Sequence, residues 1–190
     1  PAARSMPVIR VTVTSGYLKM HPGVTFVSEQ TGSSPMVAQG GNGFQVLRTN
    51  HTSFTVSDLD RTCDFFVNAL GFEVVSRAPR DPTLIRQITG VAEADIEVAY
   101  IQGPGHRLEL IQYLAPAVRK RIEAQPCDTG FAHLAFDVTD VDAAIAASQV
   151  YGFRSINSPA PIDKGPNAGS RVVYIRDPDG ITIEYIEKPT

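Results

Sequence analysis

Four side chains of the kinds that bind divalent metal ions recur in this sequence in a regular order: His51, Glu109, His133 and Glu184. Neutral imidazoles and carboxylates suit borderline or hard ions, so the set fits zinc, nickel, cobalt, iron(II) or manganese. Two carboxylates cancel the charge of a divalent ion, which makes the assembly less costly to bury than either part alone. Because such ions can accept six ligands, four protein ligands leave open positions for water or substrate.

An internal repeat relates the two histidines. Each is followed by a phenylalanine three residues later, a valine five residues later, and then Ser/Thr-Asp-apolar-Asp. Both copies continue to a Gly-Phe pair and end in a strand-like segment that carries one of the glutamates. We therefore predict an N-terminal extension over residues 1–43 and a first module over residues 44–116. A linker over residues 117–129 then leads to a second, similar module over residues 130–190.

The expected strands place the four candidate ligands on comparable faces. Alternate side chains of a strand share a face, so Leu108 and Leu110 lie opposite Glu109, and Ile183 and Tyr185 lie opposite Glu184. The apolar faces should pack on helices, which leaves the glutamates and histidines on the other, concave faces. If the modules pair about a pseudo-twofold axis, the two His/Glu sets meet at one centre.

Each module is predicted as a strand, a helix and further strands. The pairs Ser57-Asp58 and Thr139-Asp140 supply the N-cap side chains of the helices, and Gly71 and Gly152 end the helices in a left-handed conformation. We also expect a strand over residues 8–14 and a short helix over residues 115–125. Strand phase predicts that four side chains line the cavity, with ordinary sheet packing as the alternative: Ile111, Tyr113, Phe131 and Tyr174.

Composition excludes several classes of protein. The chain has 190 residues, of which 43% are hydrophobic and 19% are charged, as in an ordinary globular protein. A net charge of −3 without a basic cluster argues against a nucleic-acid partner. No apolar run is long enough to span a membrane, and no signal peptide is evident. Two cysteines make no disulfide framework, which favours the cytoplasm.

The sequence resembles the vicinal oxygen chelate superfamily, which includes glyoxalase I, methylmalonyl-CoA epimerase, extradiol dioxygenases and antibiotic-resistance proteins. The matching segments include the motif Gly130-Phe-Ala-His133 and the motif Asp177-Pro-Asp-Gly followed by Glu184, and together they cover about residues 44–188. The resemblance implies an α+β fold of paired βαβββ modules that form an incomplete β-barrel around one metal ion, often in a homodimer. It also implies a small-molecule substrate that binds through two neighbouring oxygens, with the metal stabilising an enolate or similar anion.

Within this superfamily, several activities remain open. The ligand order resembles bacterial-type glyoxalase I, in which the last glutamate, here Glu184, can also act as the base. Other segments resemble the epimerases, whose catalytic glutamate corresponds to Glu93. We therefore expect a metal-dependent lyase or isomerase that acts on a small carbonyl compound, thioester or thiol adduct. An extradiol-type iron(II) dioxygenase using His51, His133 and Glu184 is one alternative, and a ligand-sequestering resistance protein is another. Arg171 and Arg176 could contact an acidic group of the substrate or remain exposed strand residues.

Overall fold

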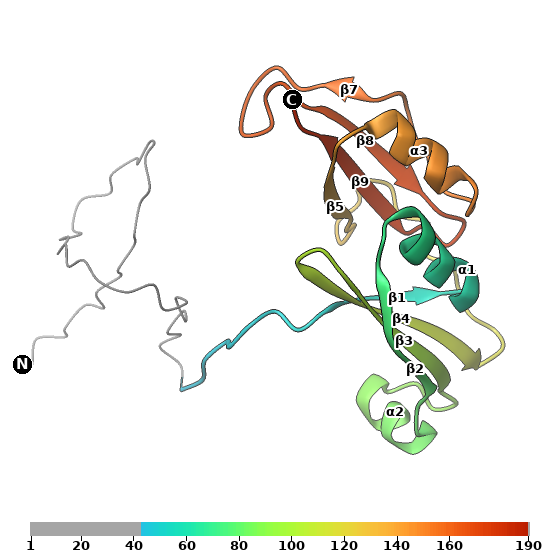
Figure 1. The fold of residues 1–190 in the computed structure, drawn as a ribbon. Helices are drawn as coiled ribbons and strands as arrows, with labels where there is room; N and C mark the ends of the chain where they lie inside the picture. Colours follow the sequence, from blue (N-terminus) through green and yellow to red (C-terminus); the bar gives the residue numbers. More distant parts are fainter. Residues whose placement is uncertain (1–42, 190) are drawn as a thin grey trace, which may run out of the picture. The chain divides into compact units, whose positions relative to one another are not determined.

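The computed structural model describes residues 43–189, and the strand expected at residues 8–14 lies outside them. One compact unit, residues 49–190, carries all the described helices and strands (Figure 1). Its first half contains β1 (Thr52–Val56), α1 (Leu59–Asp64), the π-helical turn η1 (Phe65–Ala69), β2 (Glu73–Pro79), α2 (Pro82–Thr89), β3 (Asp95–Gly103) and β4 (His106–Ala115). Its second half contains β5 (Leu134–Val138), α3 (Val141–Gln149), β6 (Arg154–Ser155), β7 (Ala160–Pro161), β8 (Arg171–Arg176) and β9 (Thr182–Glu187).

The two halves repeat the same sheet topology. The first sheet has the strand order β1-β4-β3-β2, and the second has β5-β9-β8-β6, with β7 added beside β8. The strand β1 runs parallel to its neighbour β4, and β5 runs parallel to its neighbour β9. All other neighbouring strands are antiparallel. The expected α+β fold with two modules is therefore confirmed, and neither sheet closes into a barrel.

The helices begin and end where their capping residues predict. The side chains of Asp58 and Asp140 accept hydrogen bonds from the backbone N–H groups three residues later, which satisfies donors that the first turn leaves free. Gly71 and Gly152 follow the two helical segments with φ angles of 71° and 88°, in the left-handed region that favours glycine.

A single apolar core joins the helix-bearing faces of both sheets. Leu108 and Leu110 from β4 are fully buried in it, as are Ile183 and Tyr185 from β9. The rings of Phe65 and Phe153 stack across the two halves with their centroids 3.8 Å apart, and α3 contacts η1, the turn that follows α1. The modules are thus held together through their helices, so the faces that carry the glutamates are on the other side of each sheet.

The linker between the modules is not helical, contrary to the expectation of a short helix over residues 115–125. A helix of this length is marginal in water unless an apolar face packs on the protein. Val118 is 93% exposed and Ile122 is 79% exposed, so no such packing is available. The side chain of Arg119 instead donates a hydrogen bond to the carbonyl of Pro116.

No helix in residues 43–189 combines the length and the apolar character that crossing a membrane requires.

Candidate functional site

The first module brings a histidine, a glutamate and a tyrosine together. His51 immediately precedes β1, and Glu109 lies on the neighbouring strand β4, opposite Ser53. The Nε2 atom of His51 is 3.2 Å from Oε2 of Glu109. Tyr100, opposite Glu109 on β3, donates a hydrogen bond of 2.5 Å to Glu109 Oε1. This hydrogen bond raises the pKa of Tyr100, because the phenol loses it on ionisation.

The second module repeats this arrangement. His133 immediately precedes β5, and its Nε2 atom lies 3.1 Å from Oε2 of Glu184 on β9. Tyr174 lies opposite Glu184 on β8, and its ring centroid is 4.9 Å from that of His133. Burial, together with the negative charge of Glu184, raises the pKa of Tyr174. In the described part of the chain no hydrogen bond joins Tyr174 to Glu184, so Oε1 of Glu184 remains free to accept a proton.

The chemistry of the first pair fits a bound cation. The Nδ1 atom of His51 is 2.8 Å from Oδ1 of Asn50, and since an amide oxygen only accepts, Nδ1 carries the proton. In the neutral ring, the lone pair of Nε2 then faces the carboxylate of Glu109. Two acceptors at this distance repel each other unless a second proton or a metal ion neutralises them. Both side chains are only partly exposed, at 28% for His51 and 15% for Glu109, which strengthens this repulsion.

The two pairs do not meet within one chain. Among residues 43–189, no group of three or more histidine, cysteine, aspartate or glutamate side chains is placed to hold a metal ion. The expectation that both His/Glu sets converge in a single chain is therefore not met. The physical reason is the packing of the modules. Their helix-bearing faces are buried in the shared core, so each His/Glu pair lies on the opposite face of its sheet, away from that core.

The other predicted site residues have different surroundings. Ile111 and Tyr113 lie on the same face as Glu109 and pack against a buried apolar cluster, whose members are Ile85, Ala94, Ile96 and Val98. The ring of Phe131 lies 6.2 Å from that of His133, centroid to centroid. Glu93 is exposed in the turn between α2 and β3, and within the described residues it forms no hydrogen bond or ion pair with either His/Glu pair.

Sequence reasoning missed Tyr100, although the repeat contained the signal. Residues 98–101 have the sequence Val-Ala-Tyr-Ile, and residues 172–175 have Val-Val-Tyr-Ile. Each tyrosine lies directly opposite the glutamate of its own sheet. Each candidate site is therefore a repeated unit of histidine, glutamate and tyrosine.

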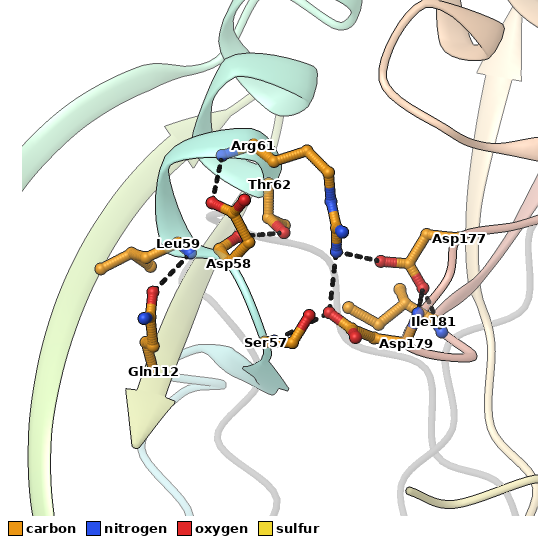
Figure 2. Close-up of polar contacts among 9 residues, drawn as sticks. All are labelled: Ser57, Asp58, Leu59, Arg61, Thr62, Gln112, Asp177, Asp179 and Ile181. Atoms are coloured by element: carbon orange, nitrogen blue, oxygen red, sulfur yellow. Dashed lines mark hydrogen bonds and ion pairs between the residues drawn. The ribbon is translucent and has the colours of Figure 1, made fainter. Parts of the chain in front are cut away.

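A polar contact between the modules fixes the turn that leads into β9 (Figure 2). Arg61 of α1 places Nη2 2.8 Å from Oδ2 of Asp179 and 3.6 Å from Oδ2 of Asp177. The backbone N–H of Ser57 also donates to Asp179 Oδ2 at 2.8 Å, while Oδ1 of Asp177 accepts from the backbone N–H groups of Asp179 and Ile181. Burial raises the pKa of Asp177 to about 6, against the opposing effect of these hydrogen bonds. This contact ties the turn that precedes β9 to Ser57 and to α1 of the first module.

Comparison with known proteins places this geometry in context. The model of the Glyoxalase/Bleomycin resistance protein/Dioxygenase superfamily matches residues 48–185. A 2-epi-5-epi-valiolone epimerase from Actinomyces sp is 35% identical over 148 residues, which cover 75% of this chain and 80% of that protein.

Two further relatives extend the comparison. A putative lactoylglutathione lyase from Brassica oleracea var. gemmifera is 27% identical over 139 residues, or 73% of this chain, and the match spans only 43% of the plant protein. The crystal structure of a glyoxalase family protein from Bacillus cereus superposes with a TM-score of 0.68 at 25% identity, covering 80% of this chain and all of the other.

Proposed function

Because the chain belongs to the Glyoxalase/Bleomycin resistance protein/Dioxygenase superfamily, we propose that it is a metal-dependent isomerase or lyase that moves a proton next to a carbonyl group of a small substrate. The observation that carries this proposal is the duplicated pair of a histidine and a glutamate, with Nε2 to Oε2 distances of 3.2 and 3.1 Å. Each pair supplies one imidazole and one carboxylate, a donor set that suits a divalent ion.

Two copies of the chain would complete the metal site. Each copy presents its two pairs on sheet faces that the shared core leaves uncovered, and one pair alone offers too few ligands for a divalent ion. In a symmetric dimer, the first module of one copy faces the second module of the other, so that His51 and Glu109 meet the partner copy's equivalents of His133 and Glu184. A homodimer with two such sites follows from the twofold symmetry.

The proposed reaction needs a positive charge beside the carbonyl oxygen and a base that moves the proton. A divalent ion, when bound, supplies positive charge that stabilises negative charge developing on the carbonyl oxygen of the substrate. Glu184 is the proposed base, because its Oε1 atom has no hydrogen-bond donor among the described residues. Glu109 is the less suitable base, since the hydroxyl of Tyr100 already occupies its Oε1 atom. Glu93 is the weaker alternative because it is exposed and makes no contact with either pair.

Between the two reaction types, we favour the isomerase. The epimerase relative shares 35% identity over 80% of its own length, whereas the match to the plant lyase is less similar and covers under half of that protein. Epimerisation at a carbon beside a carbonyl group needs a base that removes the proton and a site that stabilises the resulting negative charge. Glu184 and the His/Glu pairs are suited to these two tasks. Glyoxalase-type lyase chemistry uses the same elements and is the second candidate.

Metal analysis and isotope exchange test this proposal together. We expect the purified protein to bind a divalent metal and the H133A variant to lose both metal and activity. In deuterium oxide, the metal-loaded protein should place deuterium next to the carbonyl group of one member of a substrate panel. The panel contains cyclic polyol ketones, glutathione hemithioacetals and 2-methyl-branched acyl-CoAs. Retention of metal and activity by H133A would contradict the proposal, as would oxygen consumption with catechols in the absence of any deuterium exchange.

A further inference from the structure

One arginine beside the second His/Glu pair has a guanidinium nitrogen without a hydrogen-bond partner among the described residues. Arg176 ends β8 and lies opposite Thr182 on β9, two residues beyond Tyr174, so it shares the sheet face of Tyr174 and Glu184. Arg176 and Glu184 are diagonal neighbours in this antiparallel pair, with Cα atoms about 7–8 Å apart. A small ligand can therefore contact both side chains at once.

The guanidinium of Arg176 is held in a fixed orientation. Its Nε atom donates a hydrogen bond of 3.1 Å to Oγ1 of Thr182, and its carbon atom Cζ lies 5.6 Å from the centre of the Phe131 ring. Its Nη2 atom is buried and has no hydrogen-bond partner among residues 43–189. Burying a charged donor without an acceptor is costly, which indicates that an acceptor from a ligand belongs there.

The other arginine of the same strand differs in this respect. Arg171 donates to Asp142 at 2.8 Å and to Glu187 at 3.3 Å, so its charge is balanced within the protein. Because Arg171 has these two acidic partners and Arg176 has none within the described residues, the two arginines have different roles.

Arg176 also lines a cavity that is large enough for a small molecule. The cavity has a volume of about 380 Å³ and lies between linker residues 121–125 and the β8–β9 turn. Arg121 contributes a second positive charge, while Glu123 and Asp177 contribute carboxylates. Oδ1 of Asp177 accepts hydrogen bonds from two backbone N–H groups, and Oδ2 lies 3.6 Å from Nη2 of Arg61. Like Nη2 of Arg176, Oδ2 of Asp177 is buried and has no hydrogen-bond partner among residues 43–189, and no ion pair joins Asp177 to Arg176 there.

We propose that Arg176 binds an anionic group of the substrate, a carboxylate or a phosphate, while the reacting carbon lies beside Glu184. This inference rests on the function proposed above and adds a substrate class to it. Because Nε is already bound to Thr182, the terminal nitrogens of the guanidinium remain to donate charge-assisted hydrogen bonds to such a group. Hydrogen bonds of this kind are stronger than those to a neutral substituent. Arg176 is therefore a specificity-determining residue, which selects acidic substrates over neutral ones.

Binding of inorganic phosphate to the metal-free full-length protein tests the role of Arg176 without depending on the metal. By isothermal titration calorimetry at low ionic strength, the R176Q variant should bind phosphate at least about tenfold more weakly than the wild type, and R176K should lie between them. The R171Q variant, changed on the same strand, should bind as the wild type does. Equal binding by R176Q and wild type, or no phosphate binding by the wild type, would overturn the proposal.

A matched pair of ligands tests the substrate class in the metal-loaded protein. Malate and its monoamide β-malamate share the vicinal hydroxyl and carboxylate oxygens and differ only in the remote group, which is charged in malate. We expect the wild type to prefer malate about tenfold and R176Q to lose this preference while it retains its metal. A preference that R176Q keeps would contradict the role of Arg176. Absence of metal from the wild type would refute the proposed function instead, and the phosphate titration would still decide the role of Arg176.

Discussion

Replacement of Asp177 by asparagine should make the free energy of unfolding less dependent on pH. The carboxyl group is buried, and burial raises its pKa from 3.8 to about 6 in the folded protein. The folded state therefore binds a proton more tightly than the unfolded state does. This group stabilises the fold fully below pH 3.8, and its contribution falls as the pH rises towards 6 and stays low above it.

The size of the effect follows from the pKa difference. A rise from 3.8 to about 6 corresponds to about 3 kcal/mol, at 1.36 kcal/mol for each pKa unit. About 2.4 kcal/mol of this loss falls between pH 4 and pH 7. The D177N side chain keeps an oxygen for the backbone N–H groups of Asp179 and Ile181 but has no charge to bury. The stability of D177N relative to wild type should therefore rise by about 2.4 kcal/mol over this range.

Urea unfolding followed by circular dichroism at pH 4, 5, 6 and 7, at one protein concentration, measures this difference. The D179N variant is the matched control, because the pKa of Asp179 shifts in the opposite direction. Burial raises this pKa, but the hydrogen bonds from Ser57 and Arg61 lower it by a larger amount, so the net shift is downward. D179N should therefore lose stability relative to wild type as the pH rises. A D177N difference that stays constant with pH, or falls as for D179N, would refute the assignment of a buried, destabilising charge to Asp177.

Two further substitutions and one labelling experiment test other parts of the structure. Y100F removes the hydrogen bond that orients one proposed metal ligand, so the metal dissociation constant, measured by competition with a chelator, should rise about 10–100-fold, whereas an unchanged value would contradict this role. G103A places a Cβ atom 2.3 Å from the buried ring of Phe72, so unfolding experiments should show a loss of about 1–3 kcal/mol that F72L partly restores. With a thiol reagent, Cys127, which is exposed, should react at once. Cys63, whose pKa burial raises to about 11, should react only on unfolding, and rapid reaction of both thiols in the folded protein would disagree with this burial.

Much of the fold could be predicted from local sequence signals, but α2 was missed. The two modules, their helix caps and the strands around Glu109 and Glu184 follow from the repeat and from strand alternation. The helix α2 also had a signal, because Asp81 precedes Pro82 and Gly90 follows the helix at a φ angle of 71°. The short linker helix was wrong because propensity alone does not stabilise a helix whose apolar residues have nothing to pack against.

The candidate site could be predicted as two pairs, but their separation could not. Strand phase places Glu109 and Glu184 on their faces, and the histidines precede the neighbouring parallel strands. Whether the modules join through these faces or through their helices depends on long-range packing, such as the stacking of Phe65 on Phe153. No local pattern specifies this choice. That Arg176 has no acidic partner among the described residues could not be predicted either, since the sequence does not distinguish a paired arginine from an unpaired one.

The central claim is that a pair from one copy and a pair from another hold the same ion, and mixing two defective variants tests it most directly. H51A keeps the second pair intact, and H133A keeps the first, so neither variant alone should retain metal. When the two are refolded together in equal amounts, half of the dimers are mixed and contain one intact site. The metal content per chain should then recover to about one quarter of the wild-type value. No recovery on mixing, or full metal retention by either variant alone, would contradict a site shared between two copies.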